Sequence, residues 1–125
     1  MRKMSILVLL ASALVLLASC NSNDERLPML YGDWEGVAWT DADGKRVNDP
    51  SQVRFSFAED AGYTADMGQQ SEAGNFVFRD AKLYTTATGD RKVEKVVAVE
   101  SLDGDTLVFN MNRSGNPELL VLARQ

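Results

Sequence analysis

The feature that most constrains the fold of this chain is a series of short alternating segments, each ended by a turn signal. Val53, Phe55 and Phe57, for example, alternate with Arg54 and Ser56. A period of two places successive side chains on opposite faces of a β-strand. No sustained helical stripe interrupts the series. The pattern therefore predicts an all-β domain.

Eight predicted strands follow one another along the chain. They cover residues 33–40, 53–58, 63–67, 76–79, 83–88, 93–102, 107–111 and 118–124. Tight connections join them into an antiparallel meander, and a meander of eight strands has the number at which it closes into an up-and-down barrel. Residues 68–74 are expected to form a polar loop. A two-sheet sandwich is the alternative, and it would need a longer crossing connection, for which only this loop is a candidate.

The N-terminus resembles a bacterial lipoprotein signal. Arg2 and Lys3 precede an apolar run over residues 6–18, and Leu17-Ala18-Ser19 leads directly to Cys20, the single cysteine. An uncleaved membrane helix would need about 20 apolar residues, more than this run supplies. The other alternative is an ordinary signal peptide with an incidental cysteine. We expect a signal peptide over residues 1–19 and lipid attachment, including a palmitate-type acyl chain, at Cys20.

The lipid would anchor the mature chain to a membrane of the cell envelope. Residues 20–26 are polar and are expected to form a flexible tether, followed by a single barrel domain over residues 27–125. Asn21 is not the aspartate that often retains lipoproteins at the inner membrane, so an outer-membrane location is favoured. Asp24-Glu25 could belong to a surface-display signal or to a solvated tether, so the sequence does not decide between the periplasmic and the surface face of the outer membrane.

Charge and composition exclude several functions. The formal charge is −5, and loss of Arg2 and Lys3 with the signal would make the chain more acidic still. This charge disfavours nucleic acid and anionic lipid surfaces as partners. The chain has no histidine, and its one thiol is assigned to lipidation. The paired carboxylates, such as Asp41/Asp43, lie in predicted turns, where Asp is favoured for local hydrogen bonds. We expect neither enzymatic activity nor a cofactor or metal.

Several short motifs together resemble the lipocalin-like domains of bacterial lipoproteins. Residues 30–34 (Leu-Tyr-Gly-Asp-Trp) look like the Gly-x-Trp signature that opens the first lipocalin strand. Residues 53–57 match a phenylalanine-rich second strand, and residues 99–109 resemble a late strand pair. Residues 120–124 match an apolar last strand capped by a basic residue. The resemblance spans residues 27–125 and implies a lipocalin-like β-barrel.

The resemblance also implies a structural pair at the closed end of the barrel. In lipocalins the signature tryptophan packs there, often under an arginine from the last strands, and the matching residues are Trp34 and Arg124. A guanidinium over an indole ring contributes about 0.5–2 kcal/mol. Pro28 suits the start of a one-turn 3₁₀ segment that places Leu30 at the same end. The alternative is a plain core tryptophan and a frayed terminus.

Trp39 does not fit strict alternation with Trp34, because an odd number of positions separates them. A β-bulge at Gly36 would bring both rings to the same face, since glycine within a strand often marks a bulge. The sequence therefore predicts a bulge in the first strand.

The barrel interior is the candidate ligand site. The candidate lining residues are large and apolar: Phe55, Phe57, Tyr63, Met67, Phe76, Phe78, Phe109 and Met111. Eight strands leave room either for side chains alone or for one small ligand. Rings of this size could fill the interior completely, so a packed core and a pocket both remain open.

Three functions remain open at this point. The protein could bind a small apolar ligand in the barrel, which the resemblance favours. With a filled barrel it could instead act through its outer surface on a protein partner, as an inhibitor or accessory subunit. An exposed patch involving Trp39, Val37 or Tyr84 would favour that alternative. A purely structural role is the third.

Overall fold

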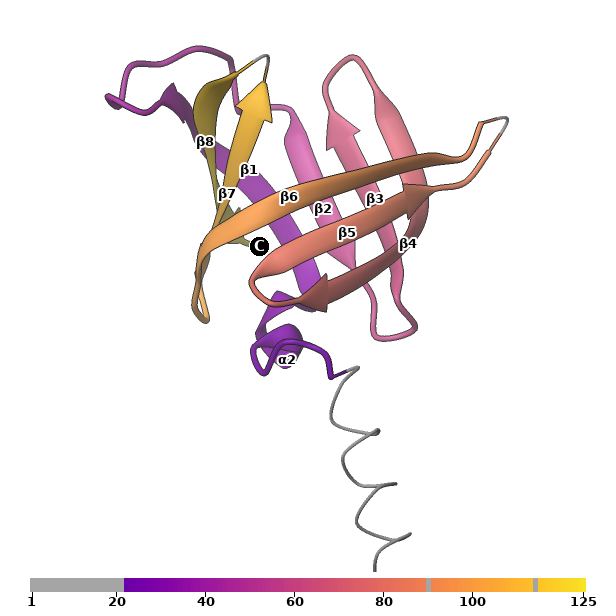
Figure 1. Ribbon diagram of the computed structural model, residues 1–125. Coiled ribbons are helices and arrows are strands. Elements are labelled where there is room, and N and C mark those ends of the chain that lie inside the picture. The colour runs from indigo at the N-terminus through magenta and orange to yellow at the C-terminus, as the bar shows by residue number, and fades with distance from the viewer. Residues whose placement is uncertain (1–21, 90, 114) are drawn as a thin grey trace, which may run out of the picture.

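The computed structural model describes residues 22–89, 91–113 and 115–125 (Figure 1). The predicted signal peptide and Cys20 lie outside the described residues. The elements are α2 (Leu27–Leu30), β1 (Gly32–Asp41), β2 (Val53–Phe57), β3 (Gly62–Met67), β4 (Ser71–Arg79), β5 (Lys82–Ala87), β6 (Val93–Leu102), β7 (Thr106–Arg113) and β8 (Asn116–Arg124). Within these ranges no helix has the length and apolar character needed to cross a bilayer.

The strands form one closed antiparallel barrel in the order β1 to β8. Each strand pairs with its neighbour in sequence, and β8 returns to pair with β1 from Trp34↔Arg124 to Asp41↔Glu118. The predicted fold class is confirmed, and the two-sheet sandwich is excluded. We call the end that carries α2 and the β2–β3, β4–β5 and β6–β7 turns the base. The opposite end, where the β1–β2 and β3–β4 connections lie, is the mouth (Figure 1).

The predicted bulge in β1 is present. The β1–β8 register shifts between Gly36 and Ala38, so that Val37 is the extra residue and is 56% exposed. The shift restores the inward phase of Trp39, which is 4% exposed. Gly36 is required here, because a Cβ at this position would overlap the carbonyl oxygen of Pro50. One extra residue thus lets β1 bury both tryptophans.

The predicted polar loop over residues 68–74 is wrong in its second half. β4 begins at Ser71, which pairs with Asp66, so only residues 68–70 connect the two strands. The hydrogen bonds of a β-ladder join backbone groups and do not depend on apolar side chains. β8 likewise begins at Asn116, two residues before the predicted start. Polar strand ends near the mouth were therefore missed.

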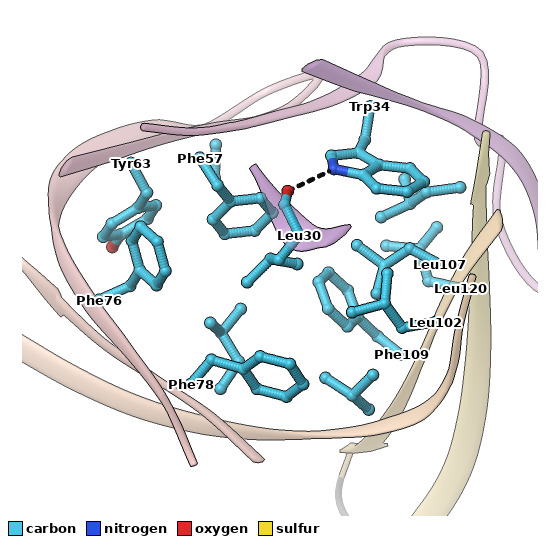
Figure 2. Packing of buried hydrophobic residues seen from close by; sticks show 14 of the residues in the cluster. Leu30, Trp34, Phe57, Tyr63, Phe76, Phe78, Leu102, Leu107, Phe109 and Leu120 are labelled. Carbon is cyan, nitrogen blue, oxygen red and sulfur yellow. Dashed lines mark hydrogen bonds between the residues drawn. The ribbon is translucent and has the colours of Figure 1, made fainter. Parts of the chain in front are cut away.

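Aromatic side chains fill the lower and central part of the barrel. Phe57, Phe78 and Phe109 are at most 2% exposed, and Figure 2 shows them pointing inward around Leu30. The ring centroids of Phe57 and Phe76 lie 5.2 Å apart in an edge-to-face arrangement. Burial of each such side chain contributes about 1.5–3 kcal/mol. The base of the barrel is a packed hydrophobic core.

Candidate functional site

The base is closed by α2, which inserts one leucine beneath the first tryptophan. Leu30 and Trp34 are both fully buried, and the Trp34 Nε1–H donates to the Leu30 carbonyl oxygen at 2.9 Å (Figure 2). Pro28 lies in the first turn of α2, which is one turn of α-helix rather than the expected 3₁₀ segment. Proline is tolerated there because the first N–H groups of a helix have no partner within it.

Arg124 covers this closure from the outside. Its guanidinium carbon lies 4.3 Å from the ring centroid of Trp34. The same group donates to the carbonyl oxygens of Gly104 and Tyr31, both at 2.7 Å, and to that of Met29. It thus ties β8 to α2 and to the β6–β7 turn. The structure places the two residues of the sequence-derived pair in direct contact.

Three of the candidate lining residues are less buried than the others, and two of them, Met67 and Met111, lie toward the mouth ends of their strands. Phe55, Met67 and Met111 are only partly buried and pack against the top of the core. Phe55 forms the floor, because its ring centroid lies 5.9 Å from that of Phe57 and 5.3 Å from that of Phe109. The other five candidates, Phe57, Tyr63, Phe76, Phe78 and Phe109, are buried below this level. The candidate site therefore divides into a packed base and a partly open apolar mouth.

Polar side chains on the interior face surround the apolar mouth. The Trp39 Nε1–H donates to Glu118 Oε1 at 2.7 Å. Lys95 Nζ lies 3.3 Å from Glu72 Oε1, so this ion pair joins β6 to β4 across the intervening strand β5. Lys95 stands opposite Thr85 in the β5–β6 register, and Thr85 is buried, so both face the interior. The mouth thus has an apolar floor and a charged rim.

Sequence reasoning did not find this rim. Glu72 is in phase with the inward residues Phe76 and Phe78, which could have placed it inside. This alternation does not predict a strand position for Glu72, because residues 68–74 are expected from the sequence to form a loop.

Tyr63 carries a polar atom inside the core. Its hydroxyl is buried beside the Thr85 side chain and makes no hydrogen bond of normal geometry. Burial raises the pKa of this hydroxyl above its ordinary value, so it is neutral near pH 7. A buried polar group without a partner costs about 1–3 kcal/mol. The packed base therefore contains one polar atom whose hydrogen bonding is incomplete.

Two surface hollows lie outside the barrel. One of about 480 Å³ lies between the N-terminal segment and the β4–β5 turn, lined by Asp24, Arg26 and Arg79 among others. The second, of about 420 Å³, crosses the outer face of β2, β3 and β4, where Ser56 and Thr64 line it. No group of three or more His, Cys, Asp or Glu side chains in the described ranges is arranged to hold a metal ion.

Solved structures with the same architecture exist. A lipocalin-like protein from Bacteroides uniformis superposes with a TM-score of 0.61 at 15% identity, covering 78% of this chain and 99% of its own. The fold is lipocalin-like. An uncharacterized protein from Bacteroides eggerthii gives a TM-score of 0.59 at 15% identity, covering 77% of this chain and 99% of its own. No protein-family model and no curated protein matches the sequence. At this identity the likeness establishes the fold alone.

The outer wall of the lipocalin-like barrel carries one apolar row. Val77, Tyr84 and Val96 stand opposite one another across β4, β5 and β6. Val77 is 44% exposed and Val96 is 61% exposed. Of the residues expected in such a patch, Tyr84 lies in this row and Val37 is exposed on the β1 bulge. Trp39 does not belong to an exposed patch, because the predicted bulge turns it inward.

Proposed function

We propose that this protein is a lipid-anchored lipocalin-like protein of the cell envelope that binds a small apolar ligand at the mouth of its barrel. The observation that carries the proposal is the division of the interior into two levels. Phe57, Phe78 and Phe109 fill the base, whereas Met67 and Met111 stay partly exposed at the mouth. A ligand would cover these side chains and the face of Phe55 without displacing the packed core.

The ligand is expected to be mainly apolar and to carry one hydrogen-bonding group. Methionine side chains adapt their shape to irregular apolar surfaces. Lys95 and Glu72 provide charge at the rim, where a polar group of the ligand would lie.

The proposed location follows from the sequence. Cys20 would carry the lipid and hold the barrel at a membrane of the envelope, with the outer membrane favoured by Asn21. The protein would act by binding, without catalysis.

Native mass spectrometry of the full chain, purified from the cells that make it, tests ligand binding. We expect a retained small molecule on the wild type, its loss in Met111→Glu, and its retention in Val37→Glu, which places the same charge on the exposed bulge. Unfolding curves establish that both variants fold. A bare wild-type mass would contradict the proposal.

A protein partner is the alternative, and the Val77–Tyr84–Val96 row favours it. In that case Val96→Glu would abolish recovery of a partner from envelope extracts, and Met111→Glu would have no effect. The two variants therefore separate the two functions.

A further inference from the structure

The segment that leads to the proposed lipid anchor is fastened to the base of the barrel. The Asp24 backbone N–H donates to the Phe78 carbonyl oxygen at 2.9 Å. The Asp24 carboxylate accepts a hydrogen bond from the Ala81 backbone N–H at 2.9 Å. These bonds join residue 24 to the end of β4 and to the β4–β5 turn. The expected tether over residues 20–26 is therefore wrong at its C-terminal end, because residues 24–26 belong to the folded domain.

Arg26 contributes a second side chain to this contact. We call the contact the latch, and it consists of Asp24 and Arg26 bound to Phe78 and Ala81. The Arg26 guanidinium carbon lies 5.4 Å from the Phe78 ring centroid, and Nη2 lies 3.1 Å from Asp24 Oδ2. The Asp24 side chain is only 12% exposed. Asp80 and Ala81 both have positive φ, 53° and 59°, so the turn that receives the latch is a tight one.

The length of chain outside the latch limits how the barrel can sit on a membrane. From Cys20 to Asp24 the chain spans at most about 14 Å. β1 has ten residues, which at barrel tilt gives a height of about 25 Å. The chain between lipid and latch is therefore shorter than the barrel and cannot run from the base to the mouth.

We propose that the base of the barrel faces the bilayer and that the mouth opens away from it, so that ligand enters from the aqueous side. This inference rests on the proposed lipid anchor at Cys20. Exposed carboxylates on the base turns, at Glu59, Asp60, Asp103 and Asp105, oppose insertion of the base into lipid. Hydrogen bonds from the backbone N–H groups of Asp105 and Thr106 keep the pKa of Asp103 below its ordinary value, so it remains charged. The base is thus held beside the headgroups by the lipid.

Fluorescence quenching on vesicles tests the orientation. The lipidated full chain is reconstituted in phosphatidylcholine vesicles that contain a lipid with a nitroxide on its headgroup. Single thiols for a fluorophore are placed by matched substitutions at exposed alanines, Ala58→Cys on the base and Ala42→Cys at the mouth. Val96→Cys marks the barrel wall. We expect quenching to be strongest at the base, weaker on the wall and weakest at the mouth.

Three outcomes would overturn the proposal. Stronger quenching at residue 42 than at residue 58 would place the mouth on the membrane, and strongest quenching at residue 96 would mean that the barrel lies on its side. Intact mass measures acylation directly. A chain without acyl groups that does not remain with vesicles would refute the anchor itself, and the orientation with it.

The latch is tested in the same vesicles. Asp24→Ala removes the acceptor for Ala81 and Arg26, and we expect the ratio of quenching at residues 58 and 42 to fall toward one. Asp49→Ala is the matched control, because Asp49 caps Ser51 in the exposed β1–β2 connection and does not contact the base. An unchanged ratio in Asp24→Ala would show that the latch does not set the orientation.

Discussion

Arg124 lies over the indole ring of Trp34, to which it is also paired in the β1–β8 register. Arg124 thus stands in the strand pair that closes the barrel, and its side chain seals the base, while its backbone N–H donates to the Asp105 carbonyl oxygen at 3.0 Å. Glycine at position 32 makes this possible, because a Cβ there would lie 2.6 Å from Arg124 Nη1.

Replacement of Arg124 should destabilise the fold more than a surface arginine normally does. Arg124→Ala loses the cation–π contact and three hydrogen bonds to carbonyl oxygens, so we expect the free energy of unfolding to fall by about 2–3 kcal/mol. The free energy of unfolding of Arg124→Lys should lie between those of wild type and Arg124→Ala, because lysine lacks the planar guanidinium group. Urea unfolding measures both. Arg46→Ala, in an exposed ion pair, is the control with a loss under about 0.5 kcal/mol. Equal stability of Arg124→Ala and wild type would refute this role.

Gly74 should tolerate no side chain. Its Cβ would overlap the Thr86 carbonyl oxygen and lie 2.9 Å from Ala87 Cα, and backbone atoms cannot move aside as a flexible side chain can. We expect Gly74→Ala to lower the free energy of unfolding by about 3 kcal/mol, at the upper end of overpacking costs. Gly104→Ala is the control, because open space surrounds its Cβ. Equal shifts of the thermal unfolding midpoint in the two variants would contradict the close approach of β4 to β5 at Gly74.

The latch predicts a specific dependence of stability on pH. Hydrogen bonds and charge from Arg26 lower the pKa of Asp24 from 3.8 to about 2. A carboxyl with a depressed pKa in the folded state stabilises the fold above pH 3.8, and this contribution disappears as the pH falls through about 2. We expect Asp24→Asn to be less stable than wild type by about 1–2 kcal/mol at pH 7, with the difference shrinking below pH 3.8 and vanishing below about pH 2. Urea titrations across this range measure the difference. A gap that stayed constant with pH would contradict the charged latch.

The Tyr63 hydroxyl should lower the stability of the fold without contributing to ligand binding. Tyr63→Phe removes a buried hydroxyl that makes no hydrogen bond of normal geometry, so the free energy of unfolding should rise by up to about 1 kcal/mol. The same variant should retain its ligand in native mass spectrometry, because Tyr63 lies in the packed base below the proposed site. Tyr84→Phe, on the outer wall, should change neither property. A loss of stability in Tyr63→Phe would mean that the hydroxyl is already satisfied.

The strands and their order were predictable because alternation of apolar and polar side chains is a local property of the sequence. The bulge was predictable for a similar reason, since Gly36 and the mismatched phase of Trp39 lie three residues apart. The start of β4 was not, because Ser71 and Glu72 form a ladder through their backbones and carry no apolar signal.

The functional details depended on contacts between distant residues. The sequence predicts that Asp24 is part of a polar tether, and its hydrogen-bond partner Ala81 lies 57 positions away along the chain. Glu72 and Lys95 meet only because the barrel brings β4 and β6 to the same side of the mouth. Contacts of this kind follow from register and curvature, which alternation alone does not determine.

Methionine methyl NMR tests the central claim, a packed base with a ligand site at the mouth. The described chain carries Met67 and Met111 at the mouth and Met29, 46% exposed, at the base. When lipid fractions extracted from the host are added, we expect the Met67 and Met111 methyl signals to shift together and saturate, while the Met29 signal stays unchanged. A shift confined to Met29, or saturating binding that leaves Met67 and Met111 unmoved, would contradict a ligand site at the mouth.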